Sequence, residues 1–157
     1  MSVIWGYFFI ALIFATTGYV FYAGDREARI AIVMLVVASA LTVLTVYFSG
    51  QYYEYANGLV AMVDFLLLAA FLWQSLVSRR YWILGLPALQ AIVCIIHLAK
   101  FLAPEILPRA YVAGQGHWSY YQIGLIVMAA HMHRVRRKTL QNWLRGRRAS
   151  RDGVPNV

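Results

Sequence analysis

The chain has 157 residues, of which 62% are hydrophobic and 13% are charged, and its formal net charge is +8. A soluble domain usually carries about a quarter charged residues, and its apolar residues recur at helical or strand spacing. Here the apolar residues fall in long runs, which excludes an ordinary soluble domain and favours a chain solvated by lipid.

Five apolar runs follow one another, each long enough or nearly long enough to form a helix that crosses the hydrocarbon. Their approximate bounds are residues 3–23, 30–49, 57–77, 81–102 and 118–133. The fourth run contains Gly85 and Pro87, so either its helix kinks there or Pro87 belongs to the first turn. We therefore expect an all-α membrane protein: a bundle of about five transmembrane helices over residues 1–133, followed by a basic tail over residues 134–157.

The basic residues of the connections indicate which way this bundle faces. The first and third connections, on the same side as the tail, contain four arginines: Arg26, Arg29, Arg79 and Arg80. The other side has only Arg109, with Lys100 at a helix end. Because arginine and lysine accumulate on the cytoplasmic side of a membrane, the pattern predicts an outer N-terminus and a cytoplasmic C-terminus.

Three ionisable residues lie inside the predicted spans, where each needs a partner or a purpose. At 1.5 Å per residue, Asp64 lies about 10 Å, His97 about 7 Å and Lys100 about 3 Å below the outer ends of their helices. The short connection between the third and fourth helices makes them neighbours, so Asp64 can meet His97 or Lys100. Gln90, Cys94 and His97 also recur on one stripe of the fourth helix.

Two interpretations of these polar residues stay open. In the first, an ion pair or hydrogen bond of Asp64 to the fourth helix holds the two helices together, while Lys100 reaches toward the outer headgroups. In the second, Asp64, Gln90, His97 and Lys100 form a proton-accepting or ligand-binding site open to the outer side.

The tail combines basic residues with a short apolar stripe at helical spacing, formed by Leu140, Trp143 and Leu144. This pattern predicts a short amphipathic helix on the inner leaflet, where anionic headgroups attract arginine and lysine. An ordinary positive-inside anchor and a docking segment for a partner protein are the alternatives, whereas no fold presents these charges to nucleic acid. The residues expected to contact the membrane surface or a partner are Arg136, Arg137, Lys138, Trp143, Arg147 and Arg148.

No cofactor or metal site is predicted. Cys94 is the single cysteine, and the sequence contains no CxxC, P-loop, HExxH or GxSxG motif, so we do not expect an enzyme. The weak candidates for haem ligands are His97 and His117, whereas His131 and His133 are two residues apart and cannot point the same way on a helix.

Several short stretches are shared with a group of known sequences. They are Val63-Asp64-Phe65-Leu66-Leu67-Leu68, Arg79-Arg80-Tyr81-Trp82, Leu89-Gln90, His97-Leu98-Ala99-Lys100 and Trp118-Ser119-Tyr120-Tyr121. Over roughly residues 55 to 135 the chain thereby resembles a group of small uncharacterised multi-spanning inner-membrane proteins of alphaproteobacteria. The resemblance implies a bacterial inner membrane and no particular activity.

The small size, the lack of a catalytic motif, the aromatic residues on the outer side and the basic tail favour one function. We expect an accessory or scaffold subunit of a larger membrane assembly, with a membrane-protein partner or a second copy of the chain. One alternative is a small transport or ligand-binding protein that uses the outer site. The other is a membrane redox component that binds haem or a quinone.

Overall fold

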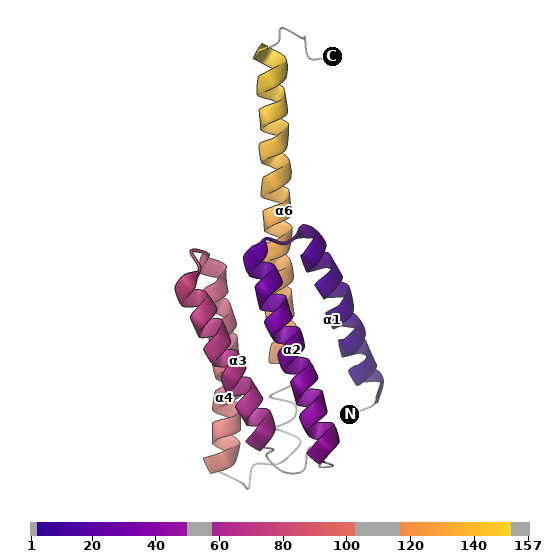
Figure 1. The fold of residues 1–157 in the computed structure, drawn as a ribbon, viewed down its shortest axis with the longest axis vertical. Helices are drawn as coiled ribbons and strands as arrows, with labels where there is room; N and C mark the ends of the chain where they lie inside the picture. The colour runs from indigo at the N-terminus through magenta and orange to yellow at the C-terminus, as the bar shows by residue number, and fades with distance from the viewer. Residues whose placement is uncertain (1–2, 50–57, 103–116, 152–157) are drawn as a thin grey trace.

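The structure, a computed structural model, describes residues 3–49, 58–102 and 117–151. These residues form five long helices, one short 3-10 helix and no strand (Figure 1). In chain order the elements are α1 (Val3–Ala23), α2 (Arg26–Ser49), α3 (Gly58–Val77), the 3-10 helix η1 (Tyr81–Leu84), α4 (Gly85–Leu102) and α6 (Trp118–Arg151). The expected all-helical bundle is confirmed.

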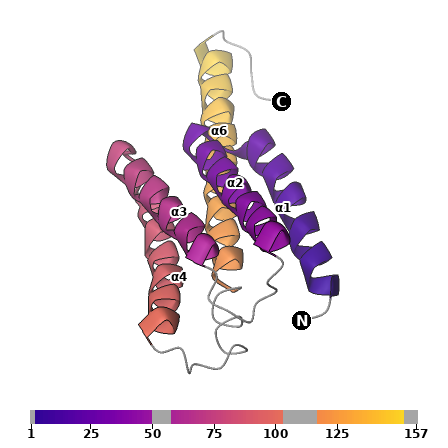
Figure 2. The same ribbon diagram turned by 60° about the horizontal axis from the view of Figure 1, so that its bottom comes forward.

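The helices run up and down and close into a ring. α1 contacts α2, α2 contacts α3, α3 contacts α4, α4 contacts α6, and α6 returns to α1. α2 and α6 also touch each other across the bundle. The α1–α2 turn and the α3–η1 turn lie at one end, whereas the N-terminus and the start of α6 lie at the other (Figures 1 and 2).

The surface of the bundle is largely apolar, and several polar side chains are among those buried inside it. Large apolar side chains point outward, as at Phe14, Leu76 and Phe101, which are 75%, 81% and 78% exposed. Glutamine, histidine and lysine side chains are buried between the helices. Three helical segments are long and apolar enough to cross a membrane: Arg26–Phe48, Gly58–Val77 and Tyr81–Leu102. An apolar surface of this kind suits contact with lipid. The polar groups then lie inside the bundle, where they can form hydrogen bonds with one another.

The α1–α2 turn is tight, and two adjacent residues make it so. The Gly24 amide donates to the Val20 carbonyl at 2.8 Å, and a Cβ at Gly24 would lie 2.6 Å from that same oxygen. The Asp25 carboxylate accepts a hydrogen bond from the Ala28 amide at 3.0 Å, which caps the start of α2. This cap explains why α2 begins at Arg26, four residues before the expected start of the apolar run.

Pro87 lies in the first turn of α4, where its missing amide hydrogen costs nothing. The residues before it form η1, so the fourth span contains a 3-10 segment followed by an α-helix instead of one kinked helix. Of the two possibilities that the sequence left open, the structure has the second.

The arginines of the first and third connections gather at one end of the bundle. Arg26, Arg79 and Arg80 line one shallow cavity of about 400 Å³ there, and α6 leaves the bundle at the same end. We call this the basic end, defined by Arg26, Arg29, Arg79, Arg80 and the residues of α6 after His133. Arg109, which was assigned to the opposite side, lies outside the described residues.

The tail is not a separate helix. α6 continues without a break from Trp118 to Arg151, and its last part projects well beyond the other helices along the same axis (Figure 1). The sequence placed the end of the fifth helix near His133, where the apolar run ends. Residues 134–151 are mostly good helix formers and include no proline, so the helix has no reason to stop at His133.

Candidate functional site

Asp64 of α3 is at the centre of a hydrogen-bonded group inside the bundle. Its Oδ2 lies 2.8 Å from Nε2 of His97, and its Oδ1 accepts a hydrogen bond from Nε2 of Gln90 at 2.9 Å. Both partners belong to α4, and the Gln90 amide also lies 3.2 Å from the Asp64 carbonyl oxygen. The carboxylate therefore joins α3 to α4 through both of its oxygens.

The same group extends to a third helix. Gln122, in the second turn of α6, donates from Nε2 to Oε1 of Gln90 at 2.7 Å. The two glutamines are only 2% and 1% exposed, so the bond between them is sealed from solvent and lipid. One continuous chain of polar contacts thus runs from His97 through Asp64 and Gln90 to Gln122 and connects α3, α4 and α6. We call these four residues the polar network.

Gln122 is the member of the network that sequence reasoning missed. The ionisable residues were the main candidates in the sequence, because a charge inside a span costs the most free energy. The fifth apolar run contains no acidic or basic residue before His131. A buried amide in that run was a usable signal, because an amide in hydrocarbon needs a partner as a charge does.

Lys100 is also buried, at 8% exposure, three residues beyond His97 on α4. It lies on the same face of the helix, as the spacing predicted. The Asp64 carboxylate contacts His97 and Gln90. Lys100 adds a buried cationic side chain to the same face of α4 as His97.

A carboxylate and an imidazole at 2.8 Å can share or exchange one proton. The carboxylate fixes the orientation of the ring, and an imidazole is the side chain whose ordinary pKa is closest to neutrality. Gln90 holds the other carboxylate oxygen, so the carboxylate cannot turn away without losing a bond. The arrangement can therefore hold helices together, bind a proton, or do both.

The four histidines lie in different surroundings. Nε2 of His97 lies 2.8 Å from Oδ2 of Asp64. His117 is exposed just before α6. His131 and His133 face different partners at the basic end: Nδ1 of His131 lies 3.0 Å from the Tyr19 hydroxyl, and Nδ1 of His133 lies 4.0 Å from Asp25.

A second group of polar contacts ties the helices together at the basic end. Oδ2 of Asp25 lies 3.5 Å from Nη2 of Arg80 and 4.0 Å from the His133 imidazole, which connects the α1–α2 turn to the α3–η1 turn and to α6. Gln74 of α3 donates to the carbonyl oxygen of Glu27 of α2 at 2.9 Å. Sequence reasoning assigned no role to Asp25.

The tail residues singled out in the sequence all lie on α6 after His133 and are exposed: Arg136, Arg137, Lys138, Trp143, Arg147 and Arg148. The guanidinium of Arg147 lies over the ring of Trp143, at 4.2 Å from its centroid. Arg134, nearer the bundle, lies 4.9 Å from the ring centroid of Tyr22. The contact between Arg147 and Trp143 holds the Trp143 ring along the surface of α6.

Comparison of the chain with protein-family models, with curated proteins and with solved structures found no match. The resemblance to the alphaproteobacterial group stays a prediction.

Proposed function

We propose that the protein is a non-enzymatic accessory or scaffold subunit of a larger assembly in a bacterial inner membrane. In this proposal the chain crosses the membrane five times, with its N-terminus outside and the basic end in the cytoplasm. The clustering of arginines at the end from which α6 projects supports this orientation, because basic residues favour the cytoplasmic side.

The projection of α6 is the observation that carries the proposal. At 1.5 Å per residue, Arg145 lies about 18 Å and Arg148 about 22 Å beyond His133. The headgroup layer on one side of a bilayer is only about 5–8 Å thick. If α6 keeps its direction, these arginines extend past the headgroups, so the lipid surface alone does not account for them.

The exposed face of the projecting helix has the composition of a docking surface. Leu140, Trp143 and Leu144 are 58%, 51% and 45% exposed and lie on one face, with Arg147 beside Trp143. An apolar stripe bordered by arginines fits a cytoplasmic protein that has an apolar groove with an acidic rim. The polar network supports the same role, because it holds the first part of α6 rigidly in the bundle.

The test compares two double variants of full-length protein, tagged at the N-terminus and extracted gently from native membranes. We expect the parent chain to co-purify with a partner in fixed proportion. Leu140→Ala with Trp143→Ala should reduce partner recovery about tenfold or more, since buried aromatic anchors are often worth at least 2 kcal/mol. Gln141→Ala with Asn142→Ala, two exposed residues outside that apolar stripe, should leave it unchanged. A parent chain that purifies alone, or equal recovery from both variants, would contradict the proposal.

A second candidate function is a proton or small-ligand site on the outer side of the membrane at Asp64, Gln90, His97 and Lys100. It is favoured by the contact at 2.8 Å between the buried His97 imidazole and the partly buried Asp64 carboxylate, with the buried Lys100 on the same helix. Ionisable side chains inside a span cost more free energy than a contact between two amide side chains, and this cost favours a role beyond stability.

Infrared difference spectroscopy of the purified protein tests this candidate across the pH range in which the protein stays folded. If Asp64 exchanges a proton, a carboxylic-acid band should rise in the parent chain at low pH and be missing from Asp64→Asn. The matched control is Asp25→Asn, which removes a carboxylate at the basic end and should keep that band. A band of equal size in the parent and in Asp64→Asn would leave Asp64 with a purely structural role.

A further inference from the structure

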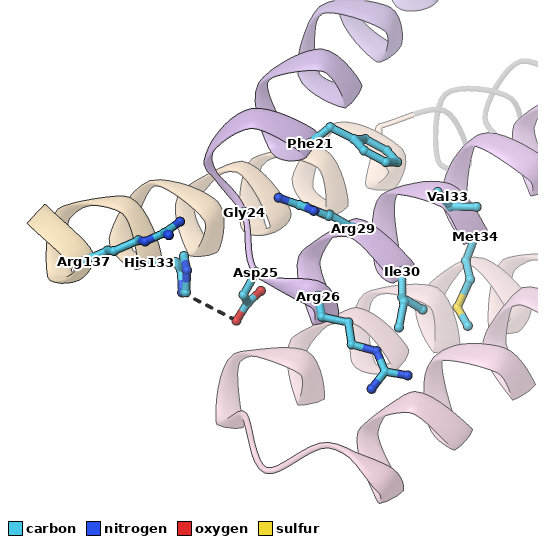
Figure 3. A pocket seen from close by; sticks show the side chains of 10 residues that line it. All are labelled: Phe21, Gly24, Asp25, Arg26, Arg29, Ile30, Val33, Met34, His133 and Arg137. Atoms are coloured by element: carbon cyan, nitrogen blue, oxygen red, sulfur yellow. Dashed lines mark ion pairs between the residues drawn. The ribbon is translucent and has the colours of Figure 1, made fainter.

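A cavity at the basic end lies between the α1–α2 turn and α6, away from the polar network. It has a volume of about 670 Å³ and opens to the surface of the bundle. Its wall comes from three elements: the end of α1, the first two turns of α2, and α6 just where it leaves the bundle (Figure 3).

One part of the cavity is rich in positive charge. Arg26 and Arg29 reach it from α2, and Arg137 reaches it from α6 (Figure 3). All three are exposed, and among the described residues no carboxylate lies within ion-pair distance of any of them. The carboxylate in the wall, Asp25, is already engaged by Arg80, by His133 and by the capped amide of Ala28. The cavity therefore presents three arginines whose charges the protein itself does not neutralise.

The other part of the cavity is apolar and continues toward the middle of the bundle. Ile30, Val33 and Met34 follow Arg26 and Arg29 along one face of α2, and Phe21 of α1 stands opposite them (Figure 3). From Arg26 to Val33 the wall extends about 10 Å along the helix axis. Val33 and Phe21 are 43% and 48% exposed, so this apolar wall is available to a ligand.

We propose that this cavity binds an anionic phospholipid, with the phosphate beside Arg29 and Arg137 and an acyl chain along Ile30, Val33 and Met34. A phosphate is the group that arginine recognises best, through paired N–H donors. A free phosphate uses only the charged part of the cavity. The apolar wall directly beside it fits a ligand whose charge is attached to a hydrocarbon chain, and basic pockets between helices at a membrane surface bind such headgroups.

The proposal is distinct from the docking surface on the far part of α6. The lipid site uses Arg137 at the level of the bundle, whereas the docking face begins at Leu140 and extends outward. One lipid held between the α1–α2 turn and α6 would brace α6 at the point where it leaves the bundle.

Native mass spectrometry of the full chain in detergent tests the proposal, with phosphatidylglycerol as the anionic probe and phosphatidylcholine as the zwitterionic one. We expect one phosphatidylglycerol per chain to bind preferentially. Arg29→Gln with Arg137→Gln should weaken that binding by roughly 30-fold, since each basic residue near a lipid surface contributes about a fivefold factor. The matched control, Arg145→Gln with Arg148→Gln, removes the same charge from the far part of α6 and should change binding by less than about twofold.

Three results would overturn the proposal. Equal weakening by both double variants would mean that the lipid responds only to the overall charge. Equal binding of phosphatidylglycerol and phosphatidylcholine would mean that the net negative charge of the headgroup does not contribute to binding. Competition by inorganic phosphate or glycerol 3-phosphate at millimolar concentration, with the same dependence on Arg29 and Arg137, would assign the cavity to a soluble phosphate compound. Circular dichroism of each variant, together with the conservative Arg29→Lys and Arg137→Lys pair, which should keep most of the binding, separates loss of the site from loss of the fold.

Discussion

Replacing Asp64 by alanine is expected to lower the free energy of unfolding of the bundle by about 2–4 kcal/mol. The substitution removes the carboxylate that accepts from the Gln90 amide and contacts the His97 imidazole, and it leaves the Gln90 amide only its longer contact to the Asp64 carbonyl oxygen. Both side chains are nearly fully buried, and neither can turn to water for a replacement bond. The penalty therefore comes more from the polar groups left behind in the span than from the lost contacts themselves.

Unfolding in mixed detergent micelles, followed by circular dichroism, measures this loss. The matched control is Thr45→Ala, because Thr45 lies in another candidate span and its hydroxyl donates only within its own helix, to Thr42 at 2.8 Å. Removing that local bond should cost no more than about 0.5 kcal/mol. A loss at Asp64 no larger than the loss at Thr45 would show that the network does not hold α3 against α4.

The bond between Gln90 and Gln122 is expected to give a large coupling energy for a single contact in a span. Gln90→Leu should cost about 2 kcal/mol, because it removes a donor from Asp64 and leaves the Gln122 amide without its acceptor. Gln122→Leu should cost about 1 kcal/mol, since it breaks one bond and leaves an oxygen unpaired. The double variant should cost about 1 kcal/mol less than the sum of the two, because it leaves neither the Gln122 amide nor the Gln90 oxygen behind without its partner.

A double-mutant cycle under the same unfolding conditions measures that coupling. The control cycle pairs Gln90→Leu with Gln74→Leu, since Gln74 bonds to the Glu27 carbonyl at the basic end and shares no partner with Gln90. Those two losses should add to within about 0.5 kcal/mol. Additivity of Gln90 and Gln122 as well would mean that the α4–α6 contact is made by apolar packing alone.

The polar network and the projection of α6 are connected through Gln122. This residue lies in the second turn of α6, so the same helix is fixed inside the bundle at one end and exposed at the other. In the proposed function the bundle is the support and the projecting part is the surface offered to a partner. A weakened network would then reduce the rigidity with which α6 is presented, even though its exposed residues stay unchanged.

The sequence by itself determined the class of fold and the approximate positions of the helices along the chain. Long apolar runs separated by short polar connections leave a helical bundle as the only way to satisfy the backbone in lipid. The sequence also placed Asp64 within reach of His97 or Lys100, because a short turn makes α3 and α4 neighbours and because these residues lie at similar depth. The gathering of arginines at one end followed from the alternation of the connections.

Only the tertiary structure decided which faces of the helices meet. In this chain both the lipid-facing and the interior-facing sides of a helix are apolar, so the periodicity that marks a buried face in a soluble protein is weak here. That is why Gln122 was missed, although its depth could have been counted, and why the cavity between the α1–α2 turn and α6 could not be anticipated. The continuation of α6 past His133 was also hidden, because the apolar pattern ends there while the local preference for a helix, which depends on the backbone and not on burial, does not.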